Sequence, residues 1–162
     1  KDEPIQDASG LCFTLRCLVN SELDRIRVVK EIIEKHPTVI IFYNFDYELE
    51  ILRDLGKELE IETAEWNGHK HQPLPKSSNW IYLVQYTAGA EGWNCITSNA
   101  MIFYSQNYSY KIMVQSAGRI DRRNSPYSDL YYYHVRSNSS IDIAIARALN
   151  RKKNFNEKGF TA

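Results

Sequence analysis

The sequence has too few cysteines, in the wrong pattern, for a disulfide-bonded or zinc-binding protein. Its 162 residues contain three cysteines, without a C-x-x-C pair and without histidines at zinc-finger spacing. It also lacks a run of 18 apolar residues and a signal-peptide pattern. These absences predict a cytoplasmic protein with no metal site and no membrane span.

Phosphate-binding patterns of two kinds are missing as well. No G-x-x-x-x-G-K-[ST] loop occurs, and the only adjacent Asp-Glu pair, Asp2-Glu3, has no strand before it. The chain thus lacks the groups that hold a triphosphate and Mg²⁺, and we expect that it cannot hydrolyse a nucleoside triphosphate by itself. No G-x-G-x-x-G follows the first predicted strand, and the four histidines are scattered, which argues against an α/β enzyme that acts alone.

The composition is typical of one globular domain, because 43% of the residues are hydrophobic and 25% are charged. The chain begins at Lys1 rather than at a methionine, so we expect it to be part of a longer protein. We predict an N-terminal extension or linker over residues 1–20, one domain over residues 21–155 and a loosely attached tail over residues 156–162.

Charge is divided unevenly along the chain although the net charge is zero. Residues 1–66 carry 8 Lys or Arg against 15 Asp or Glu, and residues 67–162 carry 12 against 5. A basic second part favours a surface for phosphates, although solvated helix faces produce the same pattern.

Helical and strand patterns alternate along the sequence. Apolar residues recur at helical spacing in the segments 23–33 and 46–57 and in a closing helix capped by Ser139 or Ser140. Apolar β-branched and aromatic runs predict strands over residues 38–45, 81–86, 100–105 and 129–135, with a weaker strand over 60–64. This order predicts an α/β fold with a mostly parallel sheet, whose site lies in the loops at the carboxyl ends of the strands.

Three arginines and a glycine lie close together in the segment Q-S-A-G-R-I-D-R-R. On a helix over residues 110–123, one polar face would carry Gln115, Gly118, Arg119 and Arg122. Glycine inside a helix costs about 1 kcal/mol relative to alanine, so we expect another backbone or a ligand to lie too close for a Cβ atom. Arginines one turn apart match phosphate oxygens; the alternative is a solvated helix end.

The loop T-A-G-A-E-G-W-N, residues 87–94, follows the predicted strand 81–86 and contains two glycines. Glycines let main-chain amides approach an anion or a sugar closely, and Thr87 can donate to a phosphate of a bound strand. Trp93 is the best candidate in this loop for stacking on a base, with ordinary packing as the alternative.

Together these segments resemble the motifs of superfamily-two helicases and translocases. Q-x-x-G-R-x-x-R looks like motif VI, A-G-x-E-G-x-N resembles motif V in its Swi/Snf-like form, and V-I-I-F-Y-N-F-D resembles motif IV. The resemblance covers residues 39–155 and is strongest to the second RecA-like lobe, the helicase C-terminal domain, of Swi/Snf-like DNA helicases encoded by bacteriophages. It implies a RecA-like three-layer α/β/α sandwich. The loop 69–78 departs from the pattern, because it is short and lacks the basic helix that many relatives insert.

The resemblance also implies roles for individual residues. Arg119 and Arg122 would neutralise charge on the γ-phosphate of ATP, and Gln115 would position the attacking water or the triphosphate. The residues implied in nucleotide binding are Glu91, Gly92, Asn94 and Gly118; those implied in nucleic-acid binding are Asn44, Phe45, Thr87, Ala88, Gly89 and Trp93.

The implied partners are an N-terminal RecA-like lobe of the same polypeptide and DNA, either duplex or single-stranded. ATP and Mg²⁺ would be held mainly by that lobe, so this chain, a monomer by itself, would bind neither tightly. A phage protein of this kind would work in the cytoplasm of a bacterial host. The alternative is a non-catalytic nucleic-acid-binding module, which would bind strongly and in a salt-sensitive way by itself.

Overall fold

The computed structural model describes residues 7–88 and 95–162. Residues 89–94 of the predicted glycine loop therefore lie outside the described residues, and they include the predicted site residues Gly89, Glu91, Gly92, Trp93 and Asn94. Along the chain, the described elements are α1 (Ala8–Asn20), α2 (Leu23–Lys35), β1 (Thr38–Tyr43), α3 (Asp46–Glu58), β2 (Glu62–Trp66), β3 (Trp80–Gln85), β4 (Ala100–Phe103), α4 (Tyr110–Ala117), β5 (Tyr131–His134), α5 (Ser140–Asn150) and α6 (Glu157–Thr161).

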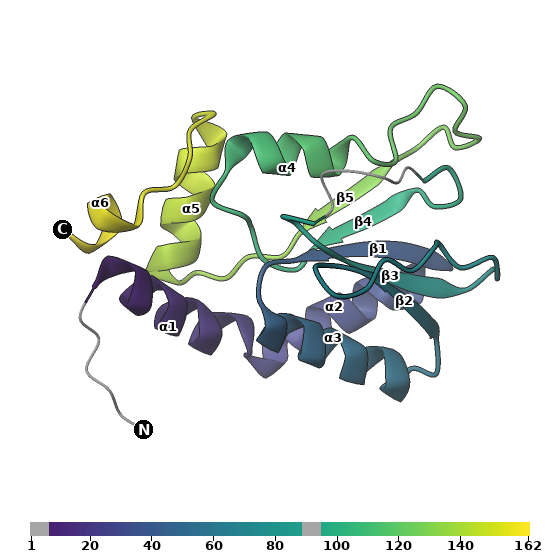
Figure 1. The fold of residues 1–162 in the computed structure, drawn as a ribbon, viewed down its shortest axis with the longest axis horizontal. Helices are drawn as coiled ribbons and strands as arrows, with labels where there is room; N and C mark the ends of the chain where they lie inside the picture. Colours follow the sequence, from purple (N-terminus) through teal and green to yellow (C-terminus); the bar gives the residue numbers. More distant parts are fainter. Residues whose placement is uncertain (1–6, 89–94) are drawn as a thin grey trace.

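The strands form one five-stranded sheet in the order β2-β3-β1-β4-β5 (Figure 1). Every neighbouring pair is parallel. Strand β1 lies at the centre, where Tyr43 pairs with Gln85 of β3 and Phe42 pairs with Phe103 of β4. All of β1 is buried, as expected for an apolar strand covered on both faces. The predicted α/β fold is confirmed, and the sheet is parallel throughout.

Helices cover both faces of the sheet and create two apolar cores (Figure 1). Helices α2 and α3 cover one face, where Val29 and Leu52 belong to the same apolar core as Ile102 of β4. Helices α4 and α5 cover the other face, where Met113 and Ile145 join the same core as Phe42 and Phe103, so the domain has three layers. Among the described residues, no helix combines the length and the apolar character that crossing a membrane requires.

Helix α1 occupies most of the segment that the sequence predicts as an extension or linker. Asp7 caps the helix by accepting a 2.6 Å hydrogen bond from the amide of Gly10. Cys12 is fully buried, and the buried Arg16 donates a 2.6 Å hydrogen bond to the carbonyl oxygen of Gln106. Helix α1 is therefore packed on the domain, and its exposed apolar residue Leu18 obscures its amphipathic pattern in the sequence.

The predicted tail also contains an ordered element. Helix α6 begins at the cap residue Asn156, which accepts a 2.8 Å hydrogen bond from the amide of Gly159. The ring of Phe160 contacts the ring of Phe155, with centroids 5.7 Å apart. Helix α6 packs beside α1, so the first and last helices of the described chain meet at one end of the domain (Figure 1).

Helix α4 ends at Ala117, so the prediction of a continuous helix to Arg123 is wrong. Gly118 is its C-cap residue, with φ of −69°, and the amide of Arg119 donates to the carbonyl oxygen of Ser116. A Cβ atom on Gly118 would lie 3.5 Å from the nearest described atom, the carbonyl oxygen of Gln115, which is an ordinary contact. The described part of the chain therefore does not crowd this glycine, and the arginines lie in a turn rather than on a helical face.

Candidate nucleotide and nucleic-acid sites

The loops after β1, β3 and β4 leave the same edge of the sheet, because these three strands are parallel neighbours. We call this edge, where the strands end, the carboxyl edge. Asn44 follows β1 directly, and its Nδ2 donates to Ser105 Oγ at 2.8 Å and to the carbonyl oxygen of Gln106 at 3.1 Å. Asn107 Nδ2 donates to Asn44 Oδ1 at 3.0 Å. The side chain of Asn44 thus ties the turn after β1 to the segment after β4.

A buried carboxylate fixes the turn that carries Asn44 and Phe45. Glu48 has no exposed surface, and its Oε1 accepts hydrogen bonds from the amides of Asn44 at 2.7 Å and Phe45 at 3.1 Å. Its Oε2 accepts a 3.1 Å hydrogen bond from Asn20 Nδ2 of α1. The helix dipole also stabilises a negatively charged side chain in the first turn of α3. The conformation of the turn is therefore set before any ligand binds.

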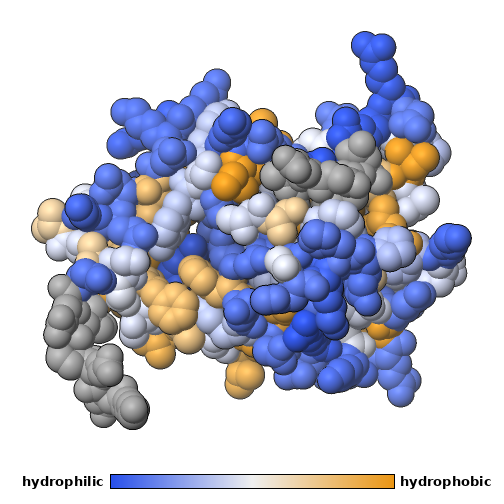
Figure 2. Space-filling model, viewed as in Figure 1, coloured by the Kyte–Doolittle hydropathy of each residue, from blue (hydrophilic) through white to orange (hydrophobic). Residues whose placement is uncertain are grey.

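Phe45 belongs to an aromatic cluster that α1 completes. The ring of Phe13 meets Phe45 edge-on with centroids 5.3 Å apart, and Tyr47 stacks on Phe45 at 5.3 Å. The guanidinium of Arg16 lies 5.4 Å from the centroid of Phe45 and 5.0 Å from that of Tyr108. Phe13 is 48% exposed, so the cluster reaches the surface, and Figure 2 shows apolar side chains gathered over α1.

The start of the glycine loop lies beside Asn44 at the carboxyl edge. The amide of Tyr86 donates to the carbonyl oxygen of Tyr43, so the strands remain paired up to this point. Thr87 is exposed, and the carbonyl oxygen of Ala88 accepts a 2.9 Å hydrogen bond from the indole nitrogen of Trp66. Thr87 and Asn44 therefore stand on adjacent loops, as the order of the strands predicts.

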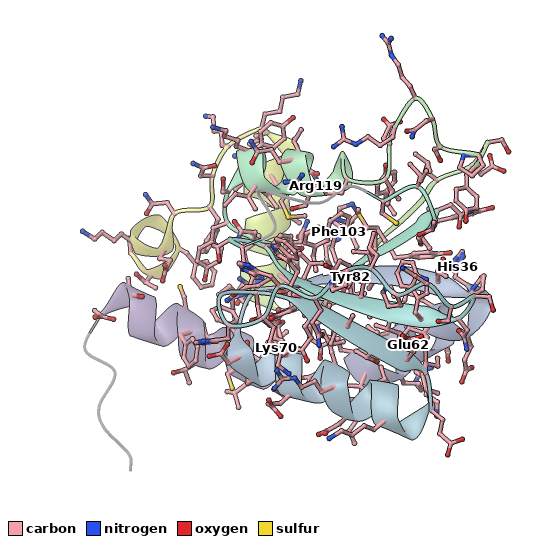
Figure 3. The ribbon with its side chains drawn as sticks, turned by 45° about the vertical axis from the view of Figure 1, so that its right-hand side comes forward. His36, Glu62, Lys70, Tyr82, Phe103 and Arg119 are labelled. Atoms are coloured by element: carbon pink, nitrogen blue, oxygen red, sulfur yellow. The ribbon has the colours of Figure 1, made fainter. Side chains whose placement is uncertain are left out.

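The segment 118–123, which we call the arginine turn, lies at the end of α4. Its Ile120 is fully buried and anchors the turn in the core, and the amide of Cys95 donates to the carbonyl oxygen of Arg119 at 3.1 Å. Figure 3 shows Arg119 on the α4 side of the sheet, toward Phe103. Burial lowers the pKa of Arg119, and the positive charge of Arg122 lowers it further. The two guanidinium groups are therefore near enough to repel each other.

The arginine turn and the carboxyl edge are separate places in the domain. Cys95, which contacts Arg119, is two residues before Thr97, whose carbonyl oxygen accepts a hydrogen bond from Thr38 at the first position of β1. The arginine turn therefore lies toward the beginning of β1, whereas Asn44 follows its end. The glycine loop links the two places along the chain. Ala88 is at the carboxyl edge, and Cys95, which follows the loop, contacts the arginine turn. Gln115 is exposed in the last turn of α4, next to the arginine turn.

The structure adds contacts at the carboxyl edge that the sequence did not indicate. Ser105, Gln106 and Asn107 contact Asn44 directly, and only their position in a turn after a predicted strand marks them in the sequence. Glu48 and Arg16 act from neighbouring helices. The partner of Arg16 is 90 positions away in the sequence, so no local pattern could have indicated it.

The parallel five-stranded sheet, the helices on both faces and the loops at the carboxyl edge define an α/β domain of the RecA-like fold. The solved crystal structure of the C-terminal part of the Fun30 ATPase domain has this fold, with a TM-score of 0.71 to this chain and 18% sequence identity. The match covers 85% of this chain and 50% of that one, so the chain spans half the length of the solved structure. At this identity the likeness shows the fold. No protein-family model matches the sequence, and no curated protein matches it.

Proposed function

We propose that this chain is the second motor lobe of an ATP-dependent helicase or translocase of the Swi/Snf-like kind. The observation that carries the proposal is the arginine turn at the end of α4, joined to the end of the glycine loop within a RecA-like fold. The likeness to the C-terminal part of an ATPase domain supports it. The chain would then work with a first lobe, which holds the phosphate-binding loop and Mg²⁺.

The arginine turn suits the triphosphate of ATP. A guanidinium offers a planar set of donors that matches phosphate oxygens, and the arginine turn carries two of them, at Arg119 and Arg122. When bound, ATP supplies the γ-phosphoryl group that is transferred to water. In this proposal Arg119 and Arg122 neutralise the charge that develops on that group, which is worth about 10³ to 10⁵ in rate in related chemistry. Gln115, exposed beside them, orients the water or the triphosphate.

The carboxyl edge suits the sugar-phosphate backbone of DNA. Thr87 presents an exposed hydroxyl that can donate to a phosphate, and Asn44 and Phe45 stand next to it on a turn that Glu48 holds rigid. The aromatic cluster around Phe45 reaches the surface at Phe13, whose exposed ring is available for stacking on a base. The glycine loop connects this edge to the arginine turn, so contact with DNA and the placement of Arg119 depend on one segment of the chain.

The test is ATP hydrolysis by the protein that contains this chain together with its first lobe, measured with and without DNA. We expect Arg122→Ala to lower DNA-stimulated turnover by about 10³ or more while nucleotide binding is retained. Arg123→Ala is the matched control, because Arg123 is the exposed neighbour in the same turn. The isolated chain should not hydrolyse ATP.

Unchanged turnover in Arg122→Ala would contradict a role for the arginine turn in catalysis. The alternative, a non-catalytic nucleic-acid-binding module, would then take its place. That module would bind DNA strongly in the absence of nucleotide and of a first lobe, with an affinity that falls steeply as salt rises.

A further inference from the structure

A second group of cations lies at the end of α5. Four basic residues occur within seven positions there, and all four are exposed: Arg147, Arg151, Lys152 and Lys153. Lys111, exposed in α4, lies close to them, because the amide of Tyr110 donates a 3.0 Å hydrogen bond to Asn154 Oδ1. We call these five residues the α5 basic cluster, and Figure 2 shows hydrophilic residues over this corner, at the upper left.

The ion pairs between described residues do not include the α5 basic cluster. Within residues 7–88 and 95–162, the pairs involve Arg25, Arg27, Lys30 and Arg53 as cations, and no pair includes a member of the cluster. Five exposed cations gathered without acidic partners repel one another. An external anion of extended shape would offset this repulsion.

Helix stability explains only part of the cluster. A cation near the C-terminal end of a helix is favoured by the helix dipole, which accounts for Arg147 in the last turn of α5 and for its C-cap residue Arg151. Lys111 lies in the first turn of α4, where the dipole disfavours a positive charge. Lys153 lies beyond the end of α5. The helix dipole therefore does not account for Lys111 or Lys153.

The backbone of Lys152 is left-handed and ends the helical segment. Its φ is 59°, the left-handed region that glycine adopts freely and other residues adopt at a cost. The turn is closed by hydrogen bonds from the amide of Lys152 to Leu149 and from that of Lys153 to Ala148. Glycine is the usual residue at such a position after a helix. A lysine there is less usual, although Glu60, after α3, has a similar conformation with φ of 55°.

The cluster is continuous with the carboxyl edge. Asn107 is hydrogen-bonded to Asn44, and the next residue, Tyr108, accepts a 2.9 Å hydrogen bond from the amide of Phe155. The rings of Tyr108 and Phe155 also contact each other at 4.8 Å. The segments 107–111 and 151–155 thus form one surface that runs from Asn44 to the lysines.

We propose that the α5 basic cluster binds the sugar-phosphate backbone of DNA and extends the contact made at the carboxyl edge. This inference rests on the proposed function, since it assumes that DNA lies along that edge. Lysines and arginines contact phosphates without reading bases, so the cluster adds affinity and a salt dependence but no sequence preference.

The test is DNA binding by the protein that contains this chain, followed by fluorescence anisotropy of a labelled duplex and of a single strand over a range of salt. We expect the double variant Lys152→Gln with Lys153→Gln to bind roughly tenfold more weakly for each lost contact at about 0.1 M salt, and the slope of log affinity against log salt to fall by about one per contact. The matched control removes two exposed lysines from the opposite layer, Lys35→Gln with Lys57→Gln, and should bind as wild type.

Lys152→Gly separates binding from folding. Glycine relieves the left-handed backbone, so we expect an equal or higher denaturation midpoint together with weaker DNA binding. Equal affinity of both double variants, with weaker binding by Thr87→Ala, would overturn this inference and leave the proposed function standing. A wild-type protein that does not bind DNA would overturn both.

Discussion

The backbone amide of Cys95 donates a hydrogen bond to the carbonyl oxygen of Arg119 at 3.1 Å. This bond attaches the residue after the glycine loop to the arginine turn. The hydrogen bond from Trp66 to the carbonyl oxygen of Ala88 holds the beginning of the loop. One short segment therefore runs from the residues predicted to contact DNA to the residues predicted to contact ATP. A motor requires such a connection, because grip on the nucleic acid must depend on the state of the nucleotide.

Gly118→Ala should separate stability from activity. The backbone at Gly118 is right-handed, and a Cβ atom would lie 3.5 Å from the nearest described atom. We expect the free energy of unfolding of the isolated chain to stay equal or to rise by about 0.4–1 kcal/mol, because alanine restricts the unfolded chain. The ATP turnover of the two-lobed protein should fall, since a methyl group would crowd a nucleotide or the first lobe.

Urea denaturation and steady-state turnover measure the two effects. Gly159→Ala is the control, because its Cβ atom would also make only ordinary contacts, in α6 and away from the arginine turn. Full turnover in Gly118→Ala would mean that this glycine serves only to end α4.

The buried ion pair between Arg25 of α2 and Asp142 of α5 should be essential for stability. The two groups are 2.6 Å apart, and each residue is 6% exposed. Asp142→Ala would leave the guanidinium buried without a charge partner, although the carbonyl oxygens of Tyr104 and Val135 still accept from it. We expect a loss of about 3–5 kcal/mol in the free energy of unfolding, measured with urea.

Arg27 provides the matched comparison on the same helix. Its pair with Glu31 is 3.1 Å long but exposed, so Arg27→Gln should cost less than about 1 kcal/mol. Equal losses for Asp142→Ala and Arg27→Gln would show that the carbonyl oxygens alone are enough to hold Arg25.

Acid should destabilise the domain through His36 and His134. Partial burial lowers the pKa of His36 below the ordinary value of 6.5, and the positive charge of Lys35 lowers it slightly further. Desolvation and the charge of Arg136 also lower the pKa of His134, but His134 is exposed in the edge strand β5, so solvent screens its contribution and His36 carries the larger part. The unfolded chain therefore takes up protons more readily than the folded one. This contribution to stability is present above pH 6.5 and is lost as the pH falls below it.

We expect the free energy of unfolding to decrease between about pH 7 and pH 5, and the double variant His36→Gln with His134→Gln to decrease less steeply. His69→Gln, in the exposed loop after β2, is the control and should follow wild type. Parallel curves for wild type and the double variant would assign the acid sensitivity to other groups.

The arrangement of the sheet could be predicted because its main strands are continuous apolar segments in the sequence. The segment V-I-I-F of β1 is buried throughout, and parallel neighbours bring the loops after Tyr43, Gln85 and Phe103 to one edge. The end of α4 could not be predicted in this way. Ile120 continues the apolar spacing of the helix, yet it reaches the core from the turn after Gly118. The spacing of apolar residues alone cannot distinguish an Ile120 on a continued helix from an Ile120 that enters the core from a turn.

The network behind the carboxyl edge could not be predicted, because its partners meet only in the folded chain. Arg16 binds the carbonyl oxygen of Gln106, and Asn20 binds Glu48. An isolated arginine or asparagine in a helix with a mixed pattern gives no sign of such partners. The sequence indicated that Asn44 is a site residue, but the structure shows what holds it in place.

The central position of β1 determines the order in which the domain can fold. Both of its partners, β3 and β4, come later in the chain, so β1 leaves the ribosome as an apolar strand with two unpaired edges. These edges close only after Ala100–Phe103 has been made. Until then they are a template for pairing with other chains, and loop closure over long separations makes their capture slow. A fragment that stops before β4 should therefore aggregate rather than fold.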